Sequence, residues 1–173
     1  SRYTSCESND DAQELAKNLS ISAQIAAIEK AYNAFDNILS EHMPLNPSGL
    51  IFENLQSRIR GTILMALSNA TSHMVLSTGN KSEMATGYAT LYGDMNGGFN
   101  ALKDVYKTQV YALAKWRNNN KPNIGLGPHG TVIPGRIIIK APTAELRDNQ
   151  TDQDSLPPYD ILDNILEGLI EKQ

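Results

Sequence analysis

The sequence predicts an α/β fold in which helices alternate with a small number of strands. The clearest helical signal covers residues 50–69, where apolar side chains recur along one stripe. The run HMVLS, residues 73–77, is typical of a short buried strand, and a glycine-rich polar turn and a helix start follow it. This order places the turn at the carboxyl edge of a sheet, where open α/β proteins bind ligands.

The remaining elements are expected from the same periodicities. Further helices are predicted over residues 7–19, 29–40, 103–116 and 159–171. Ser8 or Asn9 is expected to cap the first of these helices. A strand is predicted over 21–28, and residues 137–140 fit either a strand or a helix end. Polar connections are predicted over 43–49, 118–135 and 141–158. Two or three strands are too few for a self-sufficient doubly wound sheet, so we expect one domain that is incomplete in this chain.

Composition and charge exclude several classes of protein. The chain has 173 residues, of which 40% are hydrophobic and 20% charged, as in ordinary globular domains. A net charge of −4 argues against a general nucleic-acid binder. No apolar run is long enough for a membrane span, and the first residues do not resemble a secretory signal. The single cysteine, Cys6, allows no disulfide and no metal pair, which fits the cytoplasm; without an evident histidine partner it is more often incidental than nucleophilic.

The segment LSTGNKSEMATGYATLYGDMNGG, residues 76–98, is the first candidate site. Thr78 lies where the strand ends, Ser82 is a plausible helix cap, and Glu83 falls in the first helical turn. A carboxylate there either caps the helix or holds a divalent cation that bridges phosphates. The glycines at 87, 93, 97 and 98 would allow the backbone to approach a ligand closely.

Two further groups of residues extend this candidate. Lys107 follows Lys103 by one helical turn and could neutralise a phosphate, although a surface lysine often has no partner. Asn54 and Arg58 are four residues apart and share one helix face, which is either solvated or in contact with a ligand. Taken together, the threonine, the carboxylate, the glycines and the lysines indicate a site for nucleotide phosphates.

Long ordered motifs in the chain resemble the synthetase domain of the NAD synthetases. They are NLQSRIRGTILMALSN, the segment from LSTGNKSE to AKWRN, and APTAELRDNQTDQDSLPPYDILD, and the resemblance covers nearly the whole chain. The motifs TGNKSE and GDMNGGF resemble those of the glutamine-dependent branch. The resemblance implies a Rossmann-like, adenine-nucleotide α-hydrolase-like (ATP pyrophosphatase) fold with three α/β/α layers.

The family resemblance also implies a reaction and its residues. ATP adenylates the nicotinic-acid carboxylate of deamido-NAD with Mg²⁺ present and pyrophosphate is released; ammonia, either free or derived from glutamine, then displaces AMP to give NAD. The implied contacts to ATP come from Thr78, Lys107 and Thr143. The implied contacts to deamido-NAD come from Asn54, Arg58, Glu83 and Tyr88, with Glu83 also at the metal. No catalytic residue is assigned, and a homodimer or larger homo-oligomer is expected.

Departures from the family pattern leave other readings open. The family's Ser-Gly-Gly-x-Asp-Ser pyrophosphate loop, its basic carboxyl-terminal segment and a nitrilase-like glutaminase domain are not in the sequence. The chain is therefore expected to be part of a larger enzyme and inactive in isolation. One alternative is another ATP-pyrophosphatase amidotransferase, such as one acting on a purine nucleotide. A second alternative is a non-catalytic oligomerisation module built on the long helices.

Overall fold

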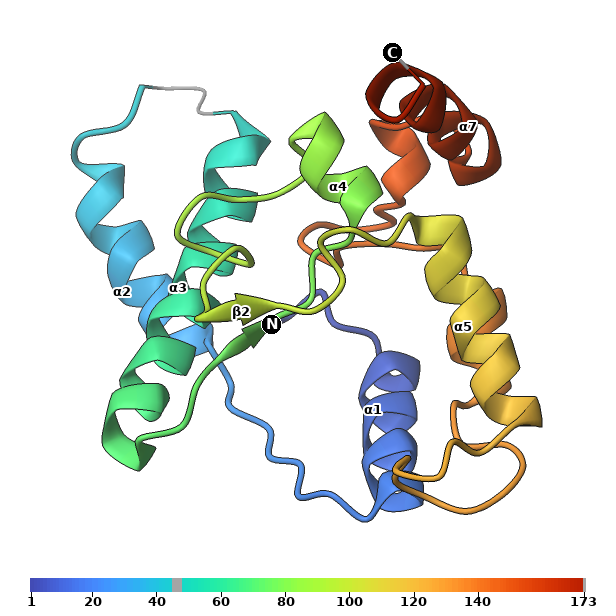
Figure 1. Cartoon of the computed structure of the whole chain (residues 1–173). Coiled ribbons are helices and arrows are strands. Elements are labelled where there is room, and N and C mark those ends of the chain that lie inside the picture. Colours follow the sequence, from blue (N-terminus) through green and yellow to red (C-terminus); the bar gives the residue numbers. More distant parts are fainter. Residues whose placement is uncertain (45–47, 173) are drawn as a thin grey trace. The chain divides into compact units, whose positions relative to one another are not determined.

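Helices predominate in the computed structural model, which describes residues 1–44 and 48–172 (Figure 1). The chain divides by its internal contacts into two units. The first unit contains Ser1–Arg2 and Ala27–Val105, and the second contains Tyr3–Ala26 and Tyr106–Gln173. Each unit has its own set of internal contacts, and the expectation of a single domain stays a prediction.

A short parallel sheet organises the first unit. Its elements in chain order are α2 (Glu29–Ser40), α3 (Gly49–Thr71), β1 (Leu76–Ser77), α4 (Lys81–Thr86) and β2 (Phe99–Asn100). Leu76 is paired with Phe99 and Ser77 with Asn100, in parallel register. Parallel neighbours need a crossover connection, and α4 lies within it. The carboxyl ends of β1 and β2 therefore lie at the same edge, as the order of strand, turn and helix predicts.

The second unit is helical and has its own apolar cluster. Its elements are α1 (Cys6–Leu19), α5 (Lys107–Asn119), α6 (Gly135–Ile139), the 3₁₀ helix η1 (Asp152–Asp154) and α7 (Tyr159–Ile170). Helix α5 contacts α6 and α7, while α1 contacts α6. The cluster consists of Tyr106, Tyr159, Leu162 and Leu166, with Leu156 packed against it. Each such buried side chain contributes roughly 1.5–3 kcal/mol, so α5 and α7 stabilise one another.

Most of the predicted helices are confirmed. Those over 7–19, 29–40, 50–69 and 159–171 correspond to α1, α2, α3 and α7 with shifts of one or two residues at their ends. The predicted cap of the first helix is wrong: Ser5 is the N-cap, and its Oγ accepts a hydrogen bond from the Ser8 amide at 3.2 Å. The apolar periodicity begins after the first turn, so it does not mark the cap.

The predicted strands are the largest corrections. Residues 21–28 are irregular and mostly exposed; Ile25 is 69% exposed. An extended segment needs partners for its backbone N–H and C=O groups, and no described strand pairs with it. The strand predicted over 73–77 shortens to Leu76–Ser77, and Leu76 is 56% exposed rather than buried.

The helix predicted over 103–116 begins later than expected. Helix α5 starts at Lys107, because Tyr106 has extended backbone geometry and the Val105 carbonyl accepts a hydrogen bond from the Lys81 amide at 2.9 Å. Two large apolar side chains on this helix, Leu113 and Trp116, are about half exposed. Residues 137–140 form a helix end, and the loop prediction for 43–49 falls partly on residues 45–47, outside the described residues.

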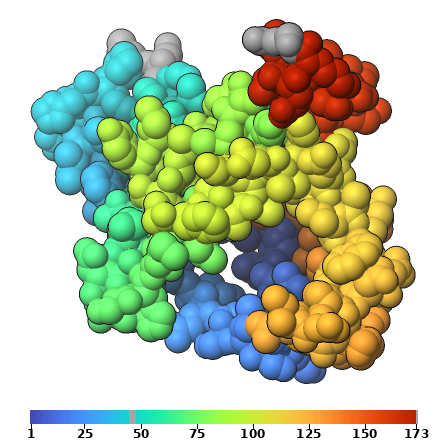
Figure 2. Space-filling view, viewed as in Figure 1, coloured from blue at the N-terminus to red at the C-terminus, as the bar shows by residue number. Residues whose placement is uncertain are grey.

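The connection between α4 and α5 lies on the surface. Figure 2 shows it coloured yellow-green to yellow across the visible face, and most side chains of residues 91–99 are exposed. Among the described residues, no helix has both the length and the apolar character needed to cross a membrane.

Candidate functional site

Glu83 and Asn80 cap the start of α4 reciprocally. The Glu83 amide donates to Asn80 Oδ1 at 3.0 Å, and the Asn80 amide donates to Glu83 Oε2 at 3.1 Å. Ser82, the expected cap, is instead fully buried within the first turn. Glu83 does lie in the first turn, as predicted. Its capping role is therefore seen directly, and a carboxylate has further lone pairs for a second partner.

A pocket of about 220 Å³ opens where β1 and β2 end. Ser77 and Gly79 follow β1, Asn100 ends β2, and all three line it. Its charged lining residues are Glu83, Asp94 and Lys103. The pocket is smaller than the ~300–1,000 Å³ usual for whole ligands, so it suits one part of a larger molecule. Thr78 lies between the two lining residues 77 and 79, and its side chain is exposed.

Asn54 and Arg58 both hold the segment that follows α4. Asn54 Oδ1 accepts from the Thr90 hydroxyl at 3.0 Å, and Arg58 Nε donates to the Leu91 carbonyl at 3.1 Å. The shared helix face predicted for them is therefore confirmed, and it faces a protein segment. Arg58 remains exposed, whereas Asn54 is half-buried.

Two glycines of this segment serve close contacts within the protein. A Cβ at Gly97 would lie 2.9 Å from the Val75 carbonyl oxygen, and Gly97 has a φ of 145° that L-residues rarely adopt. A Cβ at Gly93 would collide with the Ser57 side chain on α3. Both positions therefore require glycine for contacts within the protein; Gly97 also lines the pocket, and the expectation that these glycines let the backbone approach a ligand stays a prediction.

Gly87 places Tyr88 immediately after α4. Gly87 has a left-handed φ of 69° and ends the helix, and the Tyr88 amide donates to the Glu83 carbonyl at 2.9 Å. Tyr88 is half-buried. Its backbone is thereby fixed relative to the turn of α4 that carries Glu83.

The expected ATP contacts are divided between the units. Thr78 belongs to the first unit, while Lys107 and Thr143 belong to the second. Lys107 is the first residue of α5, and its Nζ lies 5.3 Å from the centre of the Tyr159 ring. Thr143 Oγ1 accepts from the Glu145 amide at 3.1 Å, an interaction that fixes the hydroxyl in its loop.

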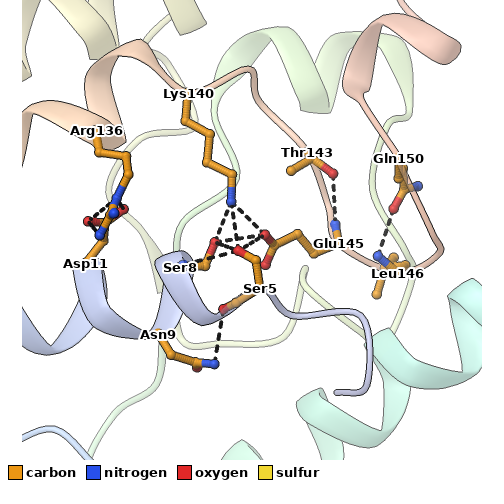
Figure 3. Close-up of polar contacts among 10 residues, drawn as sticks. All are labelled: Ser5, Ser8, Asn9, Asp11, Arg136, Lys140, Thr143, Glu145, Leu146 and Gln150. Carbon is orange, nitrogen blue, oxygen red and sulfur yellow. Dashed lines mark hydrogen bonds and ion pairs between the residues drawn. The ribbon is translucent and has the colours of Figure 1, made fainter.

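A polar cluster outside the predicted set holds the Thr143 loop (Figure 3). Lys140 Nζ lies 2.8 Å from Glu145 Oε1, 3.0 Å from Ser5 Oγ and 2.7 Å from Ser8 Oγ. Both serine hydroxyls also lie within 2.9 Å of Glu145 Oε1. Lys140 and Glu145 bracket Thr143 in the chain, so the cluster anchors both ends of the loop to the start of α1.

The pKa of Glu145 reflects this cluster. Burial alone would raise the pKa of its carboxyl, but hydrogen bonds from Lys140, Ser8 and Ser5 together with the lysine charge hold it below its ordinary value. Glu145 is therefore ionised at neutral pH. With Lys140 Nζ 2.8 Å from Glu145 Oε1, the arrangement is that of a structural ion pair.

Several residues with structural roles could not be identified from local sequence patterns. Ser5, Lys140 and Glu145 look like ordinary surface residues because their partners lie far away in the chain. Asp163 carried one signal, a carboxylate within the apolar helix predicted over 159–171. It is 5% exposed, and its Oδ2 accepts from the Thr108 amide at 2.9 Å, in the first turn of α5.

The carboxylates of the pocket lining are the candidate ligands for a metal ion. Among the described residues, no group of three or more His, Cys, Asp or Glu side chains could hold an ion. Magnesium in nucleotide sites is commonly held by one or two carboxylates plus substrate phosphates. Glu83, with Asp94 in the same pocket lining, fits that second arrangement.

Comparison with known proteins gives a consistent result. The family model described as NAD synthase matches residues 1–173. A glutamine-dependent NAD(+) synthetase from Rhodobacter capsulatus is 52% identical over 171 residues, which cover 99% of this chain and 31% of that protein. The chain therefore spans about 30% of the length of the curated relatives it matches.

Two solved structures share the fold. A glutamine-dependent NAD+ synthetase from Acinetobacter baumannii, in complex with ADP, matches with a TM-score of 0.73 and 45% identity, covering 98% of this chain and 28% of that one. An NMN synthetase from Francisella tularensis matches with a TM-score of 0.82 and 28% identity, covering 96% and 63%. These likenesses confirm the predicted Rossmann-like ATP-pyrophosphatase fold and the resemblance to the glutamine-dependent branch. The chain belongs to the NAD synthase family.

Proposed function

We propose that the protein containing this chain makes NAD from deamido-NAD and ATP. The carboxylate of the nicotinic-acid ring attacks the α-phosphate of ATP, pyrophosphate leaves, and an acyl adenylate forms. Ammonia then attacks the acyl carbon, AMP leaves, and loss of a proton gives the amide. A carboxylate is a poor acyl donor, and the mixed anhydride supplies the good leaving group that it lacks.

The observation that carries this proposal is the position of the pocket. The segment that resembles the NAD synthetases lines a cavity at the carboxyl ends of two parallel strands, where α/β proteins bind nucleotides. Glu83, Asp94 and Lys103 contribute charge of both signs there. Such a lining suits a phosphate-bearing ligand accompanied by a cation.

The ATP contacts are assigned to Thr78, Lys107 and Thr143. The family resemblance supports all three, and their positions suit the role: an exposed residue after a strand, the first residue of a helix, and a loop anchored at both ends. The Lys107 ammonium would offset phosphate charge that grows as pyrophosphate leaves. Thr143 would donate its hydroxyl proton to the nucleotide, because its oxygen already accepts from the Glu145 amide.

The deamido-NAD contacts are assigned to Asn54, Arg58, Glu83 and Tyr88. Support comes from their common neighbourhood in the first unit, where Asn54 and Arg58 hold residues 90 and 91 just beyond Tyr88. Glu83 would in addition hold Mg²⁺, which when bound offsets charge on the phosphates. We assign the protein's own contribution mainly to orientation of the two substrates and to charge stabilisation.

The nitrogen source is proposed from the names of the relatives, and the assembly from the family resemblance. The curated relatives are named glutamine-dependent, which supports ammonia released from glutamine by a glutaminase domain. A homodimer or larger homo-oligomer is proposed on the family resemblance. Several apolar side chains on α2 and α3 are well exposed, among them Phe35, Ile38 and Leu50, and a second copy would cover such a surface.

The test is product analysis with the full-length protein. With deamido-NAD, ATP, Mg²⁺ and either glutamine or ammonia, we expect NAD, AMP and pyrophosphate in equal amounts. NAD formed without AMP would contradict the adenylate route. The absence of any nucleotide binding, together with strong self-association in light scattering, would favour the non-catalytic oligomerisation module instead.

One second candidate has a specific observation in its favour. The NMN synthetase from Francisella tularensis has the higher TM-score of the two structures, 0.82 against 0.73, although its identity is lower. Nicotinic acid mononucleotide is therefore the competing acyl substrate. Its kcat/KM, compared with that of deamido-NAD, separates the two, and thermal stabilisation by xanthylate would indicate a purine-nucleotide amidotransferase.

A further inference from the structure

Two of the proposed ATP contacts, Lys107 and Thr143, are linked by a chain of contacts inside the second unit. Lys107 Nζ lies 5.3 Å from the centre of the Tyr159 ring. The Tyr159 hydroxyl donates to Asp152 Oδ2 at 2.7 Å. The Asp152 amide donates in turn to the carbonyl of Pro142 at 2.9 Å, one residue before Thr143. One tyrosine–aspartate pair thus stands between the two positions.

The pair is buried and its geometry is well defined. Asp152 is 3% exposed and Tyr159 is 7% exposed. Tyr159 also belongs to the apolar cluster with Tyr106, Leu162 and Leu166. A carboxylate taken out of water requires hydrogen-bond donors. A hydrogen bond from a hydroxyl to a carboxylate is shorter and stronger than a hydrogen bond between two neutral groups. The Tyr159 ring is therefore fixed by packing on its faces and by Asp152 at its hydroxyl.

Helix α7 fixes the start of α5 at a second point. Asp163 lies four residues after Tyr159, so the two side chains share a face of α7. Asp163 Oδ2 accepts from the Thr108 amide at 2.9 Å, next to Lys107. The backbone at Lys107 is thus held by Asp163, while the ammonium group is held by the Tyr159 ring.

Core packing alone does not account for this arrangement. A phenylalanine would fill the space of the Tyr159 ring and would need no buried carboxylate beside it. The Tyr159 hydroxyl adds a hydrogen bond to the Asp152 carboxylate, and the Asp152 backbone amide donates to the Pro142 carbonyl. The polar part of the pair therefore serves the connection to the Thr143 loop.

We propose that Tyr159 and Asp152 are positioning residues for ATP. The pair holds the Lys107 ammonium group and the Thr143 hydroxyl at a fixed separation, so that both reach one nucleotide without rearrangement. Neither Tyr159 nor Asp152 touches the nucleotide. This inference rests on the proposed function, which supplies the ATP contacts of Lys107 and Thr143.

The experiment compares matched variants of the full-length protein. Tyr159→Phe keeps the ring and removes the bond to Asp152, and we expect it to raise KM for ATP about fivefold, the effect of one hydrogen bond. Tyr159→Leu also removes the ring beneath Lys107, and we expect a rise of about twentyfold. Asp152→Ala should match Tyr159→Phe, while Asp152→Asn retains an acceptor oxygen and should remain within about twofold of the parent.

The control and the second substrate separate positioning from general damage. Asp154 lies on the same 3₁₀ helix but bonds Thr151 and Arg147, so Asp154→Ala should leave KM for ATP unchanged. KM for deamido-NAD should also stay unchanged in Tyr159→Phe. A loss of kcat with both KM values unaltered would overturn the proposal and leave the pair a purely structural role.

Two further measurements separate this inference from the proposed function. If Lys107→Met leaves KM for ATP unchanged, the proposed ATP contact itself is wrong. If Lys107→Met raises KM for ATP while Tyr159→Phe and Asp152→Ala do not, only the positioning role is wrong. NMR of the Lys107 side chain should show ring-shifted methylene protons without ATP, lost in Tyr159→Leu; their absence in the parent protein would refute the contact independently of catalysis.

Discussion

Glu83 and Thr143 are held in place in opposite ways. Glu83, in the first unit, is fixed by Asn80 three residues earlier, through two reciprocal bonds of 3.0 and 3.1 Å. Thr143, in the second unit, depends on Glu145. The Glu145 carboxylate accepts hydrogen bonds from Ser5 and Ser8, which lie 140 and 137 residues away in the chain. The first arrangement is local, while the second exists only when distant segments have folded together.

This difference determines how much of the structure a substitution affects. A change in the Asn80–Glu83 pair affects one helix start, because both partners lie within a single turn. A change in the Lys140 cluster affects α1, α6 and the Thr143 loop together, since Lys140 contacts all of these parts. Variants of the local pair should therefore separate stability from activity more cleanly than variants of the cluster.

Replacing Glu83 should have the largest effect. Glu83→Gln keeps an acceptor for the Asn80 amide, because glutamine serves equally in a capping box, but it removes the charge. We expect pyrophosphate release by the full-length enzyme to fall on the order of 100-fold while its thermal stability changes little. Glu83→Ala should lower both pyrophosphate release and thermal stability. Near-normal pyrophosphate release in both variants would show that Glu83 acts as a helix cap alone.

Lys140→Met should have the next largest effect. It should change both the stability of the protein and its KM for ATP. The substitution removes one ammonium donor from Glu145 and two serines, and we expect the free energy of unfolding to fall by roughly 1.5 kcal/mol. KM for ATP should rise several-fold because the Thr143 loop loses an anchor. Chemical denaturation and steady-state kinetics measure the two effects.

Arg136→Met provides the matched control for Lys140. Arg136 lies on α6 and pairs with Asp11 on α1 at 2.8 Å, so it joins the same two helices without contacting the loop. It should reduce stability, because the Asp11 side chain is only 5% exposed and loses its charged partner, and should leave KM for ATP unaltered. A rise in KM for ATP as large as that of Lys140→Met would mean that the helices, and not the cluster, position Thr143.

Asn80→Ala should have a smaller effect than the replacement of Glu83 or of Lys140. Loss of an N-cap side chain lowers the free energy of unfolding by about 1 kcal/mol. Asn80→Ser retains an oxygen for the Glu83 amide and should recover most of the loss. If Asn80→Ala also abolished pyrophosphate release, the cap would be required to orient Glu83, and the local pair would no longer separate stability from activity.

The same contrast explains what the sequence could predict. The helices were predictable because apolar periodicity is local, and so was Glu83 in a first helical turn. The Thr143 cluster was not, because nothing near Ser5 or Lys140 indicates a partner more than 130 residues away. The strand expected over 21–28 failed for a related reason: a strand depends on pairing partners, and its own residues do not reveal whether they exist.

The smallest effect expected is a dependence of stability on pH through Glu145. Its pKa in the folded protein lies below the ordinary value of 4.5, so the unfolded chain binds the proton more readily. The stabilisation is therefore fully present above about pH 4.5 and is lost as the pH falls through the lower pKa of the folded state; we expect less than about 1 kcal/mol. Denaturation between pH 3 and 6 should show a shallower dependence of stability on pH for Glu145→Gln than for the parent. Equal slopes for Glu145→Gln and the parent would mean that the long-range cluster does not stabilise the carboxylate, and the contrast with the local pair would then lie only in sequence distance.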